Sequence, residues 1–300
     1  MSTSTAAVAS AERTRGTVER KREMSPLAFI ATIVGYAVLI GMAFGYIFPF
    51  VVQVATSFKT DGDAAGNPMS LIANPFTTAA YTRLFAFSDF PTWGFNSFLV
   101  TFFVTIGRVF FNSLAGYALA RLRFPGRRVI FALLIAVMAV PAVVLLIPKF
   151  LVIKQLGIYD SYPGMVLPLL VDAAGVFIMK NFFESIPVSV EEQSRIDGAN
   201  TFQTFWHVVL PMARPALMTI IILSFQGSWN ELTHFIISTQ DPELTTLTKG
   251  VAQLASGQLS QGTQYPLKLA AAALMTVPVA VVFFIFQRQI MNASAGAVKE

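Results

Sequence analysis

Six stretches of apolar residues, each about 20 residues or longer, alternate along the chain with shorter polar segments. An α-helix of about 20 residues is long enough to cross the roughly 30 Å hydrocarbon core of a bilayer. Since no water reaches the backbone there, each stretch must satisfy its own hydrogen bonds and is expected to be helical. The pattern therefore predicts an all-α membrane protein with six transmembrane helices. Their approximate residues are 27–52, 95–120, 129–153, 163–183, 215–237 and 266–286.

The composition points to the same class of protein. Of the 300 residues, 55% are apolar and only 12% are charged, whereas a soluble domain has about 25% charged residues. The mean hydropathy is +0.63. A soluble fold of this size could not bury so much apolar surface, and a disordered or fibrous chain is excluded as well. The chain contains no cysteine, which excludes disulfides, thiolate metal sites and cysteine nucleophiles.

The distribution of Lys and Arg predicts the topology. The net charge of +5 raises the question of nucleic acid, but the basic residues stand between apolar stretches and are better interpreted as topology signals. They are concentrated in the N-terminal tail, 1–26, and in the loops after the second and fourth spans. An even number of spans puts both termini on one side, so both are expected to be cytoplasmic. The first apolar stretch is too long for a signal-peptide core and is expected to be retained.

The loop between the fourth and fifth spans, about residues 184–213, is the most unusual part of the chain and is expected to contain two short helices. Ser189 is the expected N-cap of the first, because Glu192 stands three residues later, as in a capping box. Gly198 is expected either to end that helix or to let another backbone approach closely. An amphipathic second helix should follow, and Pro211 is expected to break it.

Two interpretations of this loop follow from its composition. It is an interfacial amphipathic segment that anchors the fourth and fifth spans, or it is a docking element that lays a helix in a groove of a soluble partner. The loop is too polar to insert into the membrane and too apolar to stand free in water, which fits both. Composition alone does not separate them.

At this loop the sequence resembles the EAA loop of ABC-importer permeases, in which Glu-Ala-Ala is followed by Gly and later by Leu-Pro. The matching residues are Glu192, Asp197, Gly198, Ala199, Leu210 and Pro211. Gln193 and Ser194 replace the two alanines. The resemblance implies that this loop couples the chain to an ATPase subunit. It further implies that Glu192 pairs with a basic residue of that subunit and that Gly198 permits a close turn.

Further segments, in the same order along the chain, resemble the carbohydrate type of this family. They are 117–126, 156–162, 229–231 with 241–247, and 296–299. The third of them resembles the second permease subunit of maltose-type systems. The resemblance therefore implies the fold of a type I ABC importer permease. It implies a transmembrane permease domain over 27–290, with the coupling loop inside it, and a cytoplasmic C-terminal tail, 291–300.

The resemblance also implies partners. They are a second homologous permease subunit, two ATP-binding cassette ATPase subunits, an extracytoplasmic solute-binding protein and the lipid of a bacterial cell membrane, but no nucleic acid. ATP and Mg²⁺ belong to the ATPase subunits, so this chain is expected to hold no cofactor and to catalyse no reaction. Its expected function is ATP-driven import of a sugar or sugar-like solute through a pathway of which it forms half. The outer loop 238–265 is expected to reach the binding protein.

Charged residues inside the predicted spans are costly, about 2.5–3.5 kcal/mol each at mid-membrane, and should face protein or water. Arg108 and Asp172 stand near the middles of the second and fourth spans, where they could form a structural or functional ion pair. A possible substrate path lies near the outer end of the fifth span, since an aromatic ring beside amide and carboxylate groups suits a sugar. Packing between permease subunits is the alternative role of these residues. They are Ser228, Trp229, Asn230 and Glu231.

Two other classes of function compete with an ABC importer. An intramembrane enzyme is disfavoured, because the chain lacks His-Glu-x-x-His and Gly-x-Ser-x-Gly and has only two histidines, His207 and His234. The phosphate-binding P-loop pattern is absent too, so energy must come from a partner or a gradient. An ion-gradient-driven secondary transporter or channel subunit is the more serious alternative. It would not need a docking loop, and Asp172 would then be a candidate proton or ion site.

Overall fold

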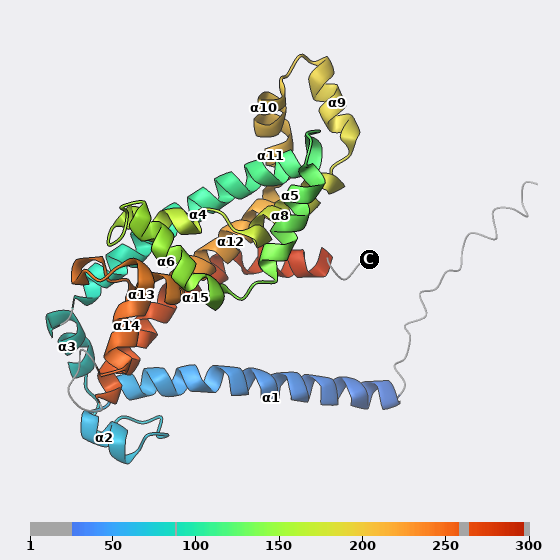
Figure 1. Ribbon diagram of the computed structural model, residues 1–300. Coiled ribbons are helices and arrows are strands. Elements are labelled where there is room, and N and C mark those ends of the chain that lie inside the picture. Colours follow the sequence, from blue (N-terminus) through green and yellow to red (C-terminus); the bar gives the residue numbers. More distant parts are fainter. Residues whose placement is uncertain (1–25, 88, 258–263, 297–300) are drawn as a thin grey trace, which may run out of the picture. The chain divides into compact units, whose positions relative to one another are not determined.

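The computed structural model describes residues 26–87, 89–257 and 264–296. The predicted basic tail lies outside these ranges except for its last residue, as do parts of the outer loop and of the C-terminal tail. Every regular element within the described ranges is helical (Figure 1), which confirms the all-α prediction. The chain divides into two compact units, one up to Val51 and one from Val52 onward, and each is described by itself.

The described residues of the first unit form one long helix. α1, Pro26–Ser57, provides this helix and continues a few residues into the second unit. None of the residues in its most apolar stretch is buried, and apolar side chains cover its whole circumference. A helix of this length and composition requires lipid or another protein around it, so α1 is long and apolar enough to be the first predicted membrane span.

Two helices of the second unit are long and apolar enough to cross a membrane without interruption. They are α4, Phe90–Arg121, and α15, Tyr265–Gly296. α15 extends into the segment expected to be a C-terminal tail, 291–300, so the helix does not end at residue 290.

The third predicted span is sharply bent. α5, Arg127–Met138, meets η1, Ala142–Leu145, and α6, Leu146–Gln155, at 104°. Pro141 stands at the break. It has no N–H to donate and disfavours helical backbone at the residue before it, so one straight helix cannot continue through this point.

The fourth and fifth spans also differ from straight rods. α7, Tyr162–Val166, and η2, Leu167–Leu169, are bent by 41° from α8, Ala173–Ser185. α12, Arg214–Trp229, is bent by 80° from the helical segment before it and ends earlier than the predicted 237. Within the described residues the structure has three unbroken candidate spans, or up to six, the predicted number, if each bent pair is counted as one span.

The remaining helices are short. On the segments between spans they are α2, Asp61–Gly66; α3, Ala79–Phe87; α13, Thr233–Ser238; η4, Pro242–Leu244; and α14, Leu247–Ala255. Between α8 and α12 they are α9, Val188–Ile196; α10, Thr201–Gln203; η3, a π-helix over Thr204–Val209; and α11, Leu210–Met212.

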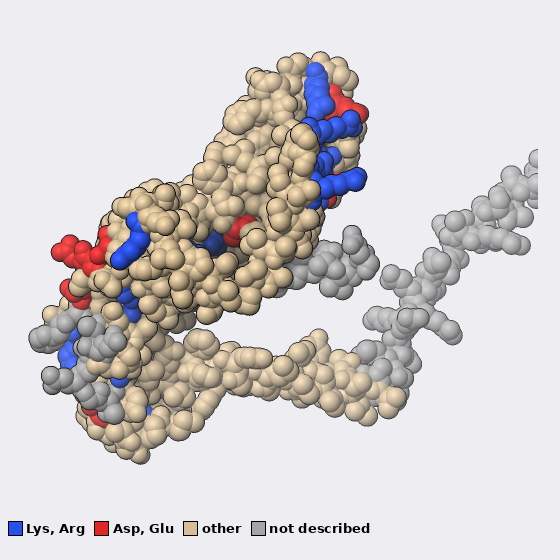
Figure 2. Space-filling view, viewed as in Figure 1, with Lys and Arg blue, Asp and Glu red and all other residues tan. Residues whose placement is uncertain are grey.

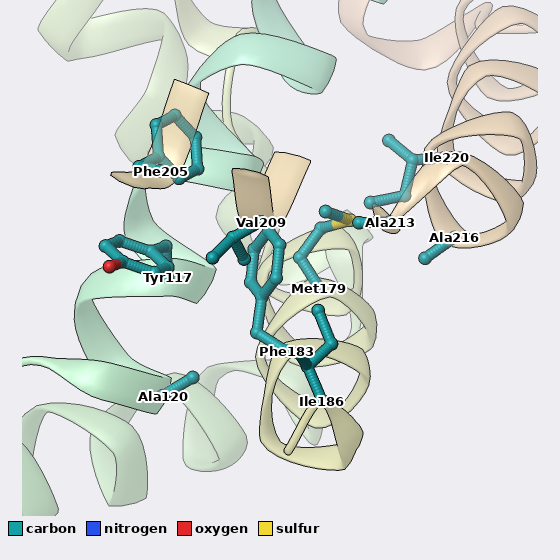
Figure 3. Packing of buried hydrophobic residues seen from close by; sticks show 10 residues of the cluster. All are labelled: Tyr117, Ala120, Met179, Phe183, Ile186, Phe205, Val209, Ala213, Ala216 and Ile220. Atoms are coloured by element: carbon teal, nitrogen blue, oxygen red, sulfur yellow. The ribbon is translucent and has the colours of Figure 1, made fainter. Parts of the chain in front are cut away.

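The largest buried cluster joins α4, α8, η3 and α12 (Figure 3). Its members are Tyr117, Ala120, Met179, Phe183, Ile186, Phe205, Val209, Ala213, Ala216 and Ile220. Gly116 allows α4 and α8 to approach closely, because a Cβ there would stand 2.6 Å from the Cβ of Met179 and 2.9 Å from the backbone nitrogen of Lys180. The cluster ties the loop between α8 and α12 to the long helix α4.

Candidate functional site

The first helix of the loop, α9, starts directly after Pro187. Pro187 is its N-cap residue, and no side chain caps the helix. The expected capping box of Ser189 and Glu192 is therefore wrong, and the helix begins at Val188, one residue before Ser189. Pro187 explains the difference, since its ring fixes φ and the missing N–H costs nothing in front of a helix. Glu191 lies in the first turn, where a negative charge is favourable.

At the end of α9, Gly198 has the first of the two roles expected of it, which is to end the helix. Gly198 has a φ of +87°, the left-handed conformation that only glycine adopts without strain. Its N–H donates to the carbonyl of Arg195, and the N–H of Ala199 donates to the carbonyl of Ser194, each at 3.0 Å. These two bonds form a Schellman motif, which ends the helix and turns the chain.

A true capping box opens the second helical segment of the loop. The side chain of Asn200 accepts from the N–H of Gln203, and the side chain of Gln203 accepts from the N–H of Asn200, both at 2.9 Å. The π-helix η3 follows, a rare form that occurs often at functional sites. Pro211 does not break this segment as expected. It sits inside α11, and the chain bends at Ala213.

α9 has an inner and an outer face. Glu191 and Ser194 are buried, and the Ser194 hydroxyl lies 2.9 Å from that of Thr204 in the next helical segment. The outer face carries the exposed side chains of Glu192, Gln193, Ile196 and Asp197. Ile196 is 79% exposed. Of the EAA-like residues on and directly after α9, Ser194 therefore packs against the next helical segment, whereas Glu192 and Asp197 remain exposed to a partner.

A buried ion pair fixes α9 to α4. The Nε of Arg121, the last residue of α4, lies 3.1 Å from the Oε1 of Glu191, and the two side chains are only 9% and 5% exposed. Arg121 also donates to the backbone carbonyls of Phe183 and Ile186 at the end of α8. One guanidinium thus joins α4, α8 and α9.

Neither residue of this pair is among those that the resemblance implies for the loop. The resemblance points to Glu192, whose side chain is exposed, and not to Glu191 beside it. In the sequence, Arg121 is one of the basic residues after the second span. The available signal was the position of Arg121 at the end of a span, in the segment 117–126 that resembles other permeases.

Arg108 and Asp172 do come together, at the break in the fourth span. The Nε of Arg108 lies 3.7 Å from the Oδ2 of Asp172 and donates to the carbonyl of Leu169 at 2.7 Å. The Oδ1 of Asp172 accepts from the N–H of Gly175, which caps α8. Asn112 donates to the Oδ2 of Asp172 at 3.0 Å.

These contacts give the ion pair a structural task. Each end of a helix leaves backbone groups unpaired, and at this break two helix ends meet. Arg108 satisfies a carbonyl of η2, and Asp172 satisfies an N–H of α8. Both charges are engaged by protein groups, which favours the structural role of the pair over a proton or ion site.

The expected substrate-path residues are used largely for packing within the chain. Trp229 is 5% exposed, stacks on Phe225 and donates from Nε1 to the carbonyl of Met275 at 3.1 Å. Its ring therefore does not present a flat face to a solute here. Ser228 is buried and donates to the hydroxyl of Thr101 at 3.3 Å.

Asn230 and Glu231 form a non-helical link after α12. Asn230 is exposed, and its side-chain amide donates to the carbonyl of Gln226. Glu231 is half-buried, and its Oε1 accepts from the N–H of His234 at 2.9 Å. Of the four residues, Asn230 thus has the most accessible polar side chain.

A cavity of about 540 Å³ lies along α4, α12 and α15, but its walls are almost entirely apolar. Phe102, Phe110, Ile221 and Phe286 are among the lining side chains. Such walls offer few hydrogen bonds to a sugar. Within the described ranges, no group of three or more His, Asp or Glu side chains is placed to hold a metal ion.

The loop after α13 is held by hydrogen bonds to Asp160 and from Lys249. Its Oδ1 accepts from the N–H groups of Gln240 and Asp241 at 2.8 and 2.9 Å, which lowers the pKa of Asp160. The Nζ of Lys249 donates to the carbonyl of Thr239 at 2.7 Å, and burial lowers the pKa of Lys249. These bonds fix the part of the outer loop that precedes α14.

The fold and this site together define an integral membrane protein of several helical spans that carries an ordered loop with one free helical face. Residues 112–292 match the family described as "Binding-protein-dependent transport system inner membrane component". The chain belongs to this family.

Several proteins that are named for the transport system they belong to match nearly the whole chain. The arabinooligosaccharides transport system permease protein AraQ of Bacillus subtilis is 30% identical over 258 residues, which are 85% of this chain and 91% of the relative. The diacetylchitobiose uptake system permease protein NgcG of Streptomyces coelicolor is 30% identical over 269 residues, 89% and 87% of the two chains. The sn-glycerol-3-phosphate transport system permease protein UgpE of Yersinia enterocolitica is 28% identical over 277 residues, 90% and 96%.

A solved structure has the same fold. It is a chain of a bacterial ABC transporter involved in the import of the acidic polysaccharide alginate, with a TM-score of 0.77, 26% identity, and coverage of 88% of this chain and 98% of that chain. The chain is therefore a permease subunit of an ABC importer in the inner membrane, a transport component without catalysis of its own. This confirms the resemblance and decides against the secondary transporter, the channel and the intramembrane enzyme.

Proposed function

We propose that this permease subunit imports a sugar or sugar-like solute and couples to its ATPase subunits through the outer face of α9. The designations of the relatives support the solute class, since two of those relatives serve oligosaccharide uptake and one serves glycerol-3-phosphate. The subunit forms half of the pathway, and a second homologous permease forms the other half. A solute-binding protein docks on the outer side, and both termini are cytoplasmic.

The exposed outer face of α9 is the main observation that supports the coupling proposal. An exposed apolar side chain, Ile196, stands among the exposed polar side chains Glu192, Gln193 and Asp197 on one short helix. Such a surface suits insertion into a cleft of a soluble partner. The alternative of a lipid anchor fits less well, because a membrane-surface helix needs a broad apolar face and a basic polar face.

The connection from α9 to the membrane helices supports a rigid transfer of motion. Arg121 links α9 to α4 and α8, and Phe205 and Val209 insert into the core between these helices. When ATP closes the ATPase dimer, α9 moves with it, and the spans tilt between inward-facing and outward-facing states. This is a rigid-body switch between two packed arrangements.

The experiment that tests the docking role compares two isoleucines of equal exposure. Ile196 on α9 and Ile72 on another loop are each 79% exposed. Ile196→Asp is expected to reduce the ATPase recovered with the purified permease by about tenfold, a loss of about 1.4 kcal/mol in binding. Ile72→Asp is expected to leave it unchanged. Equal recovery of the ATPase with both variants would contradict the proposal.

A further inference from the structure

Four basic side chains gather around one open hollow at the junction of α4, α5 and α8. The hollow has a volume of about 620 Å³, and its lining includes Arg123, Arg127, Arg128 and Lys180. Figure 2 shows a group of Lys and Arg side chains at the end of the second unit where α5 and α9 lie. These residues lie in the second unit, on a segment that the coupling role of α9 does not use.

The hollow has an excess of positive charge. Glu184 is the carboxylate that neutralises part of it, with Oε2 at 2.7 Å from the Nζ of Lys180 and Oε1 at 3.5 Å from the Nη2 of Arg127. Arg123 and Arg128 form no ion pair within the described part of the chain, and both are exposed. Two guanidinium groups therefore remain available to an anion from outside the chain.

The other side of the hollow is apolar. The Nζ of Lys180 lies 4.2 Å from the centre of the Phe131 ring, and that ring stacks on Phe177 at an interplanar angle of 8°. Val129 also lines the hollow and begins an exposed apolar face of α5 that continues through Leu133. α5 belongs to a bent candidate membrane span, so this face is suited to lie against acyl chains.

We propose that this hollow binds the headgroup phosphate of an anionic phospholipid, with the acyl chains lying along α5. Guanidinium groups bind phosphate oxygens in pairs, and a basic pocket at the membrane surface is suited to an acidic headgroup. The adjoining apolar face favours a lipid over two other occupants, free phosphate and an acidic protein surface. Free phosphate gains nothing from that face, and an acidic protein surface would leave it uncovered.

The test uses the intact transporter, purified in detergent with its partner subunits. Binding of phosphatidylglycerol, phosphatidylcholine and inorganic phosphate is measured by native mass spectrometry across a titration. Phosphatidylglycerol is expected to bind at least about tenfold more tightly than phosphatidylcholine. The double variant Arg123→Gln with Arg128→Gln is expected to weaken phosphatidylglycerol binding at least about tenfold, whereas Arg123→Lys with Arg128→Lys retains most of it.

A matched control removes two basic side chains elsewhere. Arg83→Gln with Lys268→Gln lowers the charge equally and is expected to leave lipid binding unchanged. Equal phosphatidylglycerol binding by the two Gln double variants overturns the proposal. It is also overturned if inorganic phosphate displaces phosphatidylglycerol at equal concentration, which assigns the site to free phosphate, or if the Arg123 and Arg128 variant loses its ATPase subunits, which assigns the surface to a protein contact.

Discussion

The Nε of Arg121 and the Oε1 of Glu191 lie 3.1 Å apart inside the protein, where the last residue of α4 meets the first turn of α9. The neighbouring Glu192 points outward. Two adjacent glutamates on one helix thus have opposite tasks. One connects α9 to its own chain, and the other is free for a partner.

Substitution of these two glutamates separates stability from coupling. Glu191→Ala leaves Arg121 buried without its carboxylate and is expected to destabilise the protein by about 3–5 kcal/mol. Glu192→Ala removes an exposed side chain and is expected to change stability by less than about 0.5 kcal/mol while weakening ATPase binding. Thermal denaturation of the purified transporter measures the first effect, and ATPase recovery measures the second.

A double variant tests whether the pair acts as a unit. Arg121→Met with Glu191→Leu replaces both charges by apolar groups and is expected to recover much of the stability lost in Glu191→Ala. If Glu191→Ala and Glu192→Ala have equal denaturation midpoints, the buried pair does not hold the loop.

The turn at Gly198 is expected to tolerate no larger residue without loss of transport. Its φ of +87° makes Gly198→Val costly by about 1–2 kcal/mol although no atom stands near the new side chain. The altered turn would reorient α9, so solute uptake should fall while membrane insertion persists. Gly157→Val is the control, since Gly157 has a φ of +68° and likewise no heavy atom within 4 Å of an added Cβ, in another loop. Equal loss of uptake in both variants would show that strain alone, and not the coupling turn, matters.

Asp172 is expected to act as a cap and not as a proton carrier. Asparagine caps helices as well as aspartate does, so Asp172→Asn should retain most of the uptake. Asp172→Ala removes the cap as well and should lower the yield of folded protein, at a cost of about 0.5–2 kcal/mol for the cap alone. Uptake by reconstituted vesicles at several pH values decides the matter: an inactive Asp172→Asn variant that inserts normally would support a proton or ion site.

The hydrogen bonds that Asp160 accepts from the N–H groups of Gln240 and Asp241 are expected to weaken in acid. Backbone donors hold the pKa of Asp160 below its ordinary value in the folded protein. Its stabilising effect is therefore complete above the unfolded-state pKa, about 3.9, and is lost as the pH falls through the lower folded-state pKa. Hydrogen exchange of the segment 238–246, corrected for intrinsic rates, should be faster in Asp160→Asn than in the natural protein at pH 7. The difference should begin to shrink only below about pH 4 and should vanish once the pH lies below the folded-state pKa. A difference that does not change with pH would contradict this role.

Much of the fold could be predicted because apolar length is a strong signal. α1, α4 and α15 are unbroken apolar helices, and they appear close to their expected residues. The bends were not predictable to the same degree. Pro141 is visible in the sequence, but whether a proline kinks a span or turns it by 104° depends on what packs around the break.

The candidate site shows a similar limit. Gly198 could be interpreted from local rules, since ending a helix with a left-handed residue needs no distant partner. Trp229 could not, because an indole beside polar residues suits both a sugar and a protein core, and only its contacts with Phe225 and Met275 place it in the core. The pair of Arg121 and Glu191 lies outside local rules altogether, since the two residues are far apart in the chain.

The central claim, that the outer face of α9 binds the ATPase, is tested most directly by site-specific crosslinking. The chain contains no cysteine, so a single new thiol reports on one position. Ile196→Cys and Ile72→Cys are each treated in the assembled transporter with a short thiol-to-amine crosslinker. We expect Ile196→Cys to be joined to an ATPase subunit and Ile72→Cys not to be. If Ile196→Cys forms no ATPase crosslink in an assembled transporter that still hydrolyses ATP, α9 is not the docking element.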